Sequence, residues 1–188
     1  MQIISLIIIG YILGSIPTGK ILGYVKGIDI QKKGSGNIGF ANAVRVLGWP
    51  AGIIVLIVDV LKGFIPVYLA KYFLDATLLQ QMIIGLAPII GHAYPVWLRF
   101  RGGKSIATGF GVLIALNVYI ALFGFLMYLL VFAISKKSAM GSLAAAWALP
   151  IIALALQPIL CLYFVILAFF ATYTHRVNIR QFMHEHIH

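Results

Sequence analysis

The sequence predicts an all-α, polytopic membrane protein with seven transmembrane helices, several of them short, and with its motif loops on the cytoplasmic side. Composition supports this first: 62% of the 188 residues are hydrophobic and 10% are charged, against about half and about a quarter in soluble domains. Apolar segments long enough to cross a bilayer alternate with short polar loops. These helices leave no room for a soluble domain, so residues 1–188 are expected to form one integral membrane domain.

Three apolar segments in the first half of the chain are expected to span the membrane, at about residues 3–19, 51–69 and 78–98. Pro17 is expected to bend the first one near its polar end. The second contains Asp59 and Lys62 at positions i and i+3, on one helix face where they can pair. Because ionisable groups inside a span are costly, a functional role and a structural ion pair are both open for these two residues.

The second half begins with an apolar stretch, residues 105–135, that is too long for one span and short for two. A turn at Asn117 would give two short helices of roughly 12 and 17 residues, and a single tilted helix is the alternative. After a short polar loop, two more spans are expected at about residues 139–156 and 158–173, followed by a basic, polar tail.

The basic residues predict the orientation. In a seven-span protein with its N-terminus outside, 12 of the 14 Lys and Arg residues fall on one face. They are Lys20, Lys26, Lys32, Lys33, Arg45, Arg99, Arg101, Lys104, Lys136, Lys137, Arg176 and Arg180. By the positive-inside rule this face is cytoplasmic. A five-span arrangement would send Lys136 and Lys137 outward, which argues against it.

A glycine-containing loop between the first two spans is one candidate anion site. It reads Gly34-Ser35-Gly36-Asn37-Ile38-Gly39, and a short amphipathic run containing Arg45 follows it. Glycines let the backbone turn its N–H groups toward an anion, and Ser35 and Asn37 can cap the following helix. Arg45 can return to the same place.

A second candidate anion site follows the third span, where three cations occur within six residues, 99–104. Gly102 and Gly103 precede Lys104, and Ser105 opens the next apolar run. Backbone N–H groups, a helix start and positive charge therefore converge, and phosphates are the anions that suit them. A soluble phosphate paired with a lipid-tailed phosphate would explain why the site lies at a membrane.

The acidic residues are too few and too scattered for several familiar enzyme classes. The chain has only 4 of them, Asp29, Asp59, Asp75 and Glu185. A carboxylate-built two-metal site is hard to assemble from these, and the single Cys161 offers no thiolate site. The Asp cluster of alcohol phosphotransferases, the Arg-Pro pair of lipid phosphatases and the His-x4-Asp acyltransferase signature are all missing. Group transfer that needs neither a metal ion nor a carboxylate remains.

Three motif groups carry a resemblance that extends from Gly14 to Arg180. They are the 34–39 loop with Asn42, Arg45, Leu47 and Gly48; Gly91-His92, Tyr94-Pro95, Phe100-Arg101-Gly102-Gly103-Lys104 and Ala107-Thr108-Gly109; and His175-Arg176 with Asn178, Ile179 and Arg180. Together they resemble the bacterial acyl-phosphate:glycerol-3-phosphate acyltransferase family.

The resemblance implies a single acyltransferase domain in the bacterial cytoplasmic (inner) membrane. Its reaction transfers a fatty acyl group from acyl phosphate to the position-1 hydroxyl of glycerol 3-phosphate, giving lysophosphatidic acid and inorganic phosphate, as the first step of phospholipid synthesis. Acyl phosphate is an activated donor, so positioning and charge stabilisation are the remaining demands. No cofactor, nucleic acid or obligate protein partner is expected.

The resemblance also implies site residues. His175, Lys104 and Ser142 are the expected catalytic residues, with His175 as the best protein candidate for general base and the donor's own leaving phosphate as the alternative. His92 is expected to be a structural hydrogen bonder. The expected substrate-binding residues are Gly34, Ser35, Gly36, Asn37, Arg45, Gly102, Gly103, Ser105, Asn178 and Arg180.

A membrane transporter of an anionic, phosphorylated solute is the alternative function, with the polar loops as gates. It predicts pseudo-symmetry between the two halves and polar residues at mid-bilayer on several helices. The sequence has no internal repeat, and such polar residues are limited to Asp59, Lys62 and Asn117.

Overall fold

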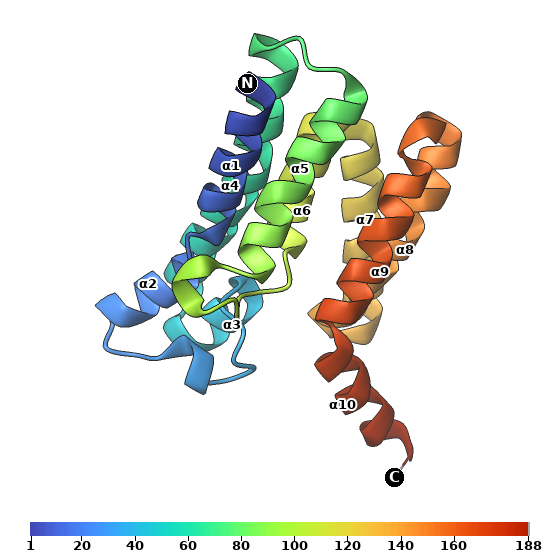
Figure 1. Cartoon of the computed structure of the whole chain (residues 1–188). Helices are drawn as coiled ribbons and strands as arrows, with labels where there is room; N and C mark the ends of the chain where they lie inside the picture. Colours follow the sequence, from blue (N-terminus) through green and yellow to red (C-terminus); the bar gives the residue numbers. More distant parts are fainter. Residues whose placement is uncertain (188) are drawn as a thin grey trace. The chain divides into compact units, whose positions relative to one another are not determined.

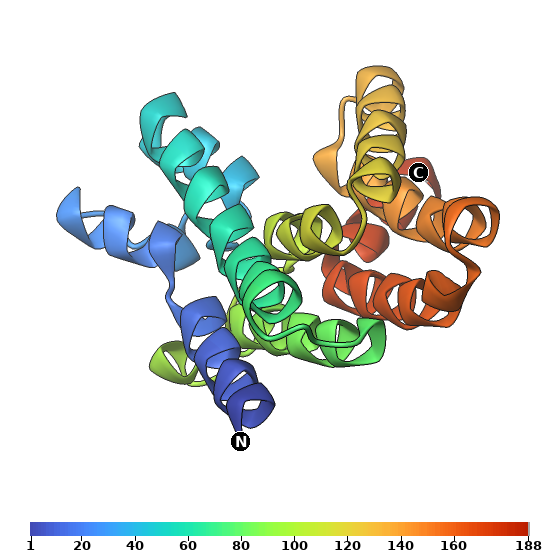
Figure 2. The ribbon, with the colours of Figure 1, turned by 90° about the horizontal axis from the view of Figure 1, so that it is seen from above.

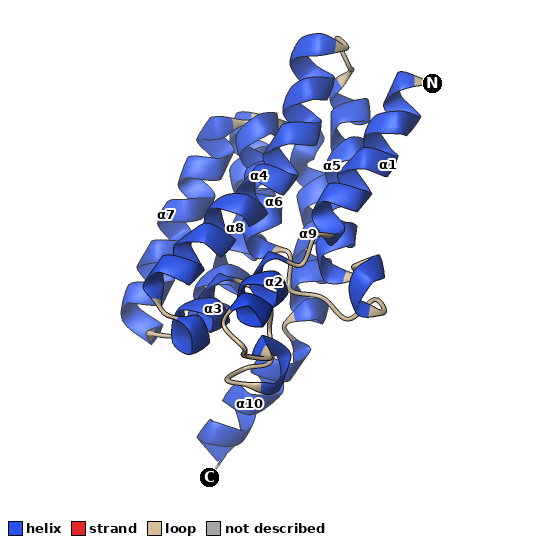
Figure 3. Cartoon of the chain, turned by 90° about the vertical axis from the view of Figure 1, so that its left-hand side faces the viewer, coloured by secondary structure: helices blue, strands red, loops and turns tan. Residues whose placement is uncertain are grey.

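The computed structural model describes residues 1–187, with the side chains of residues 1–184. Every regular element within this part of the chain is an α-helix or a short 3-10 helix (Figures 1 and 3), so the all-α prediction is confirmed. The helices divide into two compact units, Met1–Asn117 and Val118–His188.

The first unit is built around one long helix, α4 (Trp49–Phe73). Its other elements are α1 (Gln2–Ser15), α2 (Thr18–Val25), η1 (Ile30–Lys32), α3 (Phe40–Leu47), α5 (Leu78–Ala93), η2 (Val96–Leu98) and α6 (Ile106–Leu116). Helix α4 packs against α1, α3, α5 and α6, and α1 also packs along α5 (Figure 2). Helix α4 is therefore the central helix of this unit.

Glycines let α4 and α6 approach until their backbones touch. A Cβ atom on Gly63 would lie 1.9 Å from the carbonyl oxygen of Thr108, and one on Gly111 would lie 2.0 Å from that of Val60. Such close approach between small residues is typical of helix pairs in membranes, where van der Waals contact drives association. It fixes the start of α6, and with it the loop that precedes α6.

The first span breaks where Pro17 was expected to bend it. Helix α1 ends at Ser15 and α2 begins at Thr18. Proline lacks the N–H that would continue the helix. At the break, the carbonyl of Ile16 accepts hydrogen bonds from the backbone N–H of Thr18 (3.1 Å) and from the ammonium of Lys62 (2.5 Å), so this carbonyl is satisfied from inside the unit.

The second unit contains α7 (Val118–Ser135), α8 (Ser138–Leu156), η3 (Pro158–Leu160), α9 (Cys161–Thr174) and α10 (Arg176–Ile187). Helix α8 packs against both α7 and α9. The indole N–H of Trp147 in α8 donates to the hydroxyl of Thr172 in α9 (3.1 Å). This hydrogen bond joins α8 to α9.

The predicted number of seven spans is not reached by length and hydropathy. Five helical stretches of the described chain are long and apolar enough to cross a bilayer, or six if the bent pair Pro158–Thr174 and Arg176–His184 is one span. Helix α6 has 11 residues, about 16 Å against a hydrocarbon core of about 30 Å. The turn at Asn117 is confirmed, because this residue is extended (φ −156°, ψ 109°) between α6 and α7. The single tilted helix is therefore wrong.

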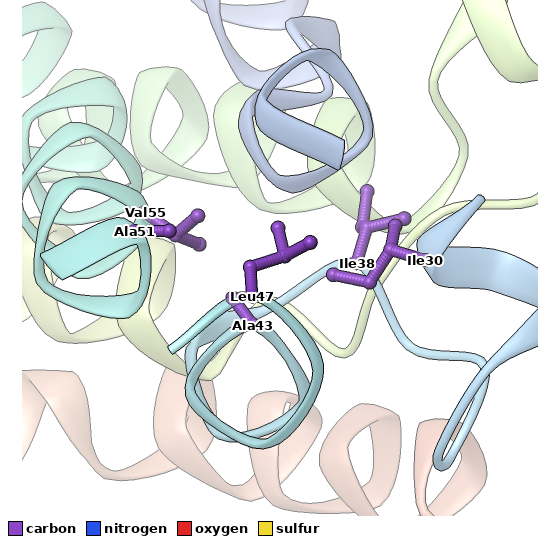
Figure 4. Packing of buried hydrophobic residues seen from close by; sticks show 6 residues of the cluster. All are labelled: Ile30, Ile38, Ala43, Leu47, Ala51 and Val55. Carbon is purple, nitrogen blue, oxygen red and sulfur yellow. The ribbon is translucent and has the colours of Figure 1, made fainter. Parts of the chain in front are cut away.

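A buried apolar cluster anchors the first glycine loop within the first unit. It brings together Ile30 before the loop, Ile38 within the loop, α3 and the first half of α4 (Figure 4). Its members are Ile30, Ile38, Ala43, Leu47, Ala51 and Val55. The loop therefore lies over a small core of its own.

Candidate active site

The first glycine loop, residues 34–39, is held together by the side chain of Asn42. This amide lies in α3 and is 1% exposed. Its Oδ1 atom accepts from the backbone N–H of Ser35 (2.9 Å). Its Nδ2 atom donates to three backbone carbonyl oxygens, those of Ile30 (3.2 Å), Lys33 (3.1 Å) and Asn37 (2.8 Å). One buried side chain thus ties both ends of the loop to α3.

The loop needs glycine at two positions. Gly34 and Gly36 have φ angles of 60° and 70°, in the left-handed region that other residues rarely adopt. At Gly34 a Cβ atom would also lie 2.2 Å from Oδ1 of Asn42. With the backbone fixed in this way, the side chains of Ser35 and Arg45 are exposed at the surface of the first unit.

The expectation that Ser35 or Asn37 caps α3 is wrong. The N-cap residue is Gly39, which makes no side-chain cap bond. The Oδ1 atom of Asn37 instead accepts from the N–H of Gly39 (3.3 Å), in a turn before the helix.

The second loop, residues 102–105, folds back onto the end of α5. The N–H of Gly102 donates to the carbonyl of Ala93 (3.0 Å) and that of Gly103 to the carbonyl of His92 (3.0 Å). The hydroxyl of Ser105, which is buried, donates to the carbonyl of Ile89 (2.7 Å). These bonds satisfy carbonyls at the C-terminal end of a helix. Any part the two glycines play in binding therefore comes from the path of the loop, since both N–H groups are paired.

The two candidate anion loops lie side by side in the first unit. The side chain of Gln31 donates to the backbone carbonyl of Arg101 (3.0 Å). A Cβ atom on Gly103 would lie 3.3 Å from Oδ1 of Asn37. In Figure 1 the segment after α5 runs beside the segment that joins α2 and α3. Residues about seventy positions apart in sequence thus share one region.

Lys104 is half-buried at this junction. Burial lowers the pKa of its ammonium group from the usual range of lysine, because removal from water disfavours the charged form. A half-buried ammonium group interacts more strongly with a phosphate than an exposed one does, because there is less solvent to screen the charges.

The second unit carries the remaining expected site residues near two helix ends. Ser142 is buried in the first turns of α8, where its hydroxyl donates to the carbonyl of Ser138 (2.9 Å). His175 is 2% exposed at the junction of α9 and α10, and its Nδ1 atom lies 2.8 Å from the carbonyl of Ala171. A carbonyl only accepts, so Nδ1 carries the proton and Nε2 holds the lone pair in the neutral ring.

The first turns of α10 carry the last two expected binding residues. Asn178 is half-buried and Arg180 is exposed. Both follow His175 within five positions, so one helix start presents an imidazole, an amide and a guanidinium group.

The ion pair predicted inside the second span is present. The ammonium of Lys62 lies 2.6 Å from Oδ1 of Asp59, and both side chains are almost fully buried. The hydroxyl of Thr18 donates to the same carboxylate oxygen (3.3 Å). Together with the hydrogen bond from Lys62 to the carbonyl of Ile16, these contacts tie α4 to the break between α1 and α2. The ion pair therefore has a structural role.

Asn42 and His92 are the positions whose importance the motifs did not reveal. Asn42 was singled out only through the family resemblance, although a polar side chain on the buried side of the amphipathic α3, together with Ala43 and Leu47, is itself a signal. His92 was expected to be a structural hydrogen bonder. Its backbone carbonyl is bonded to Gly103, but its buried Nδ1 atom has no hydrogen-bond partner.

The side chains described, residues 1–184, include no group of three His, Cys, Asp or Glu residues that could hold a metal ion. Of the three acidic residues among them, Asp29 pairs with Lys20 (2.5 Å) and Asp59 with Lys62, and Asp75 lies apart from both in the sequence. The ammonium of Lys20, through its hydrogen bond, lowers the pKa of the half-buried Asp29 carboxyl.

Comparison with known proteins gives one consistent result. The family model for glycerol-3-phosphate acyltransferase matches residues 4–185. A relative of that name from Desulforamulus reducens is 47% identical over 178 residues, covering 93% of this chain and 88% of the relative. Another from Aquifex aeolicus is 36% identical over 187 residues, covering 97% and 96%.

The fold gives the same result. A crystal structure of PlsY, an integral membrane glycerol 3-phosphate acyltransferase, in its glycerol 3-phosphate form, is 34% identical and has a TM-score of 0.92 over 98% of this chain and 94% of that one. The lysophosphatidic acid form gives a TM-score of 0.89. With its long apolar helices this chain is an integral membrane protein. It belongs to the glycerol-3-phosphate acyltransferase family.

Proposed function

We propose that this protein transfers a fatty acyl group from acyl phosphate to the position-1 hydroxyl of glycerol 3-phosphate, without a metal ion, and releases lysophosphatidic acid and inorganic phosphate. The observation that carries the proposal is the likeness to PlsY in its glycerol 3-phosphate form, which extends over 98% of the chain. Membership of an enzyme family favours this function over transport of a phosphorylated solute.

The two adjacent loops of the first unit are proposed to bind the phosphate groups. Exposed Ser35 and Arg45 and half-buried Lys104 supply a hydroxyl and two positive charges around backbone turns held by Asn42 and by the end of α5. Phosphate oxygens accept charge-assisted hydrogen bonds from such groups. Gly34, Gly36, Gly102 and Gly103 act by giving the loops their path.

The transfer itself needs only positioning and charge stabilisation. The hydroxyl oxygen of glycerol 3-phosphate attacks the acyl carbon, the bond from that carbon to the bridging phosphate oxygen breaks, and phosphate leaves with the bonding electrons. Because an acyl phosphate is a mixed anhydride with a good leaving group, its reaction does not depend on a Lewis acid. Lys104 is proposed to stabilise the charge that develops on the oxygens.

His175 is proposed as the base that takes the hydroxyl proton. The hydrogen bond from its Nδ1 atom to Ala171 leaves the lone pair on Nε2, which is the protonation state that a base requires. The leaving phosphate is the alternative acceptor. Ser142, Asn178 and Arg180 are proposed to complete the binding of the substrates.

The protein is proposed to lie in the cytoplasmic (inner) membrane of a bacterium with the site facing the cytoplasm and the N-terminus outside. Both units are proposed to serve this one reaction as a single domain, since the family match extends through both, over residues 4–185. Placing the site in the cytoplasm gives access to soluble glycerol 3-phosphate, while the acyl donor arrives from the membrane.

The test is phosphate release by the purified protein in detergent or lipid, with palmitoyl phosphate as donor and with glycerol 3-phosphate present or omitted. Chelator is included throughout, and palmitoyl-coenzyme A is supplied in a parallel arm. The proposal predicts release that requires both substrates, persists in chelator and falls at least about 100-fold in Lys104→Ala.

The arms separate the parts of the proposal. If acyl transfer occurs only from palmitoyl-coenzyme A, the protein is still an acyltransferase but acyl phosphate is not its donor. Loss of activity in chelator would contradict the metal-free mechanism. A loss of about 100-fold or more in His175→Ala supports His175 as base. Activity of that variant within a few-fold of wild type would assign the proton to the leaving phosphate.

A further inference from the structure

His92 is a buried imidazole that the proposed reaction does not use. It lies in the last turn of α5 and is 4% exposed. Its Nδ1 atom is buried and makes no hydrogen bond. A buried polar atom without a partner is costly, so its retention in a close-packed unit calls for an explanation.

One edge of the imidazole lies against the second glycine loop. A Cβ atom on Gly103 would be 2.2 Å from Nε2 and 2.9 Å from Cδ2 of His92, closer than any real Cβ contact. The backbone of Gly103 therefore rests directly on the ring. The same residue donates its N–H to the backbone carbonyl of His92 (3.0 Å), so ring and carbonyl together define its position.

The other edge of the imidazole is directed at the buried ion pair. Nδ1 of His92 lies 3.8 Å from Oδ1 of Asp59, the oxygen that also contacts Lys62 (2.6 Å) and Thr18 (3.3 Å). That distance is too long for a hydrogen bond. The ring thus lies between the buried ion pair of α4 and the backbone of Gly103.

We infer that His92 is a positioning residue, which transmits the fixed position of the Asp59–Lys62 pair to Gly103 and so sets the place of the adjacent Lys104. The inference rests on the proposed function, because it treats the loop as part of the glycerol 3-phosphate site. It gives a functional task to an ion pair that the contacts alone would class as structural.

The inference predicts a selective effect. If the ring sets only the 102–104 loop, its loss weakens glycerol 3-phosphate binding and leaves the KM for the acyl donor unchanged. A displacement of a binding loop by about an ångström can cost up to about 100-fold. A purely structural role would instead lower the thermal stability and affect both substrates alike.

The experiment measures the Kd for glycerol 3-phosphate by calorimetry, the KM for each substrate and the unfolding temperature, in the intact protein. His92→Asn keeps a polar group near Asp59 but removes the ring from beneath Gly103. We expect its Kd for glycerol 3-phosphate to rise at least about tenfold. Gln81→Leu is the matched control: it removes another buried polar side chain of α5, bonded to Ala76 (2.7 Å) at the far end of that helix.

A double variant tests the contact directly. Gly103→Ala alone places a methyl group against the ring and is expected to weaken binding. Because the two nearest atoms to that methyl group belong to His92, the combination Gly103→Ala with His92→Asn is expected to bind better than Gly103→Ala alone. Independent sites would instead show additive losses.

The charge partner is tested with Asp59→Asn together with Lys62→Met, which removes both charges and leaves neither buried alone. It is expected to raise the Kd for glycerol 3-phosphate and to leave the donor KM unchanged.

Two results would overturn the inference. One is a loss of binding in His92→Asn that Gln81→Leu shares, and the other is additive losses in the double variant. If the wild type binds glycerol 3-phosphate but catalyses no transfer, the proposed function is wrong. The inference about His92 is still tested in that case, because it is judged by the Kd values for glycerol 3-phosphate.

Discussion

Two buried polar side chains in the first unit hold the backbone, whereas two of the side chains proposed to bind the substrates are exposed. Asn42 bonds to four backbone groups around the first loop, and Ser105 bonds to the end of α5. Ser35 and Arg45, by contrast, are exposed. Because a buried polar group is costly unless it is bonded, these buried residues specify one loop path rather than adding much net stability.

The substitution Asn42→Asp tests this at one atom. The carboxylate keeps an acceptor for the N–H of Ser35 but loses the donor that serves three carbonyls, and it brings a negative charge toward them. We expect the free energy of unfolding to fall by about 3 kcal/mol or more. Chemical denaturation in detergent measures it.

The control for this prediction is Ala41→Asp, which adds the same charge at the neighbouring, exposed position of α3. It is expected to change stability by about 0.5 kcal/mol or less. Equal losses in the two variants would mean that the charge on α3, and not the bonds of Asn42, decides the result.

Lys104 makes a pH prediction with a definite sign. Burial lowers the pKa of this ammonium, so it loses its proton at a lower pH than an ordinary lysine does. As pH rises, kcat/KM for glycerol 3-phosphate is expected to fall through that lowered pKa, because the neutral amine no longer attracts phosphate. The measurement is kcat/KM between about pH 7 and about pH 10.

Lys104→Arg is the matched variant, since its guanidinium stays charged throughout this range. Its kcat/KM is expected to be flat where that of the wild type falls, whatever its absolute level. A fall of the same shape in both proteins would assign the titration to another group.

At the scale of elements, the closest packing in the first unit is that of α4 against α6. The backbones touch at Gly63 and Gly111, and this contact sets where the loop before α6 must run. The end of α6 is held as well, because the ammonium of Lys71 donates to the carbonyl of Ala115 (3.2 Å). A helix of 11 residues is thereby fixed at both ends.

Two glycines of α6 give a matched test of that packing. Gly111→Ala would place a methyl group 2.0 Å from the carbonyl oxygen of Val60, whereas Gly109→Ala meets nothing within 4 Å. The first is expected to lower the free energy of unfolding by about 1–3 kcal/mol. The second is expected to raise it by up to about 1 kcal/mol, through helix propensity. Thermal unfolding in one detergent compares them, and an equal effect of both would exclude close α4–α6 packing as the cause.

Several elements could be predicted from sequence because their causes are local. Apolar length gives most helices, Pro17 breaks the first, and Asn117 separates α6 from α7. The Asp59–Lys62 pair follows from helical spacing and the cost of burying charge.

What could not be predicted depends on contacts between distant segments. Arg99, Phe100 and Ser105 have φ angles of 51°, 62° and 60°, which local preference disfavours. These backbone conformations are stabilised by hydrogen bonds to distant segments, such as the one from Ser105 to the carbonyl of Ile89 in α5. The pairing of the Gly102 N–H group was missed for the same reason: the sequence shows a glycine but not the carbonyl that it meets.

For the whole molecule, the question that length and hydropathy leave open is the number of spans. Helix α6 alone is too short for a full bilayer core. Irregular backbone at membrane depth is tolerated where its polar groups are bonded within the protein. The segments beside α6 meet that condition, since Gly102, Gly103 and Ser105 donate to α5 and Lys71 donates to Ala115. We therefore expect α6 to cross, as the charge pattern predicts.

This predicts a side of the membrane for each loop. In a Cys161→Ala background, single cysteines at Asp75, Asn117 and Gln157 are expected to react with a membrane-impermeant maleimide in intact cells. Cysteines at Lys33 and Lys137 are expected to react only after the cells are opened. Each variant must retain acyltransferase activity, so that labelling reports the native arrangement.

The labelling pattern distinguishes seven spans from six, because every loop after α6 changes side if α6 does not cross the membrane. If α6 entered and left on the same side, Asp75 and Lys33 would label as before, but Lys137 would become reactive from outside and Gln157 protected. The basic residues after α7 would then face outward together with those of α10, against the positive-inside rule. We expect the opposite result, in which cysteines at Lys33 and Lys137 are both protected from the maleimide in intact cells. The hydrogen bonds at both ends of α6 satisfy the backbone beside it, and this allows a short helix to cross the membrane.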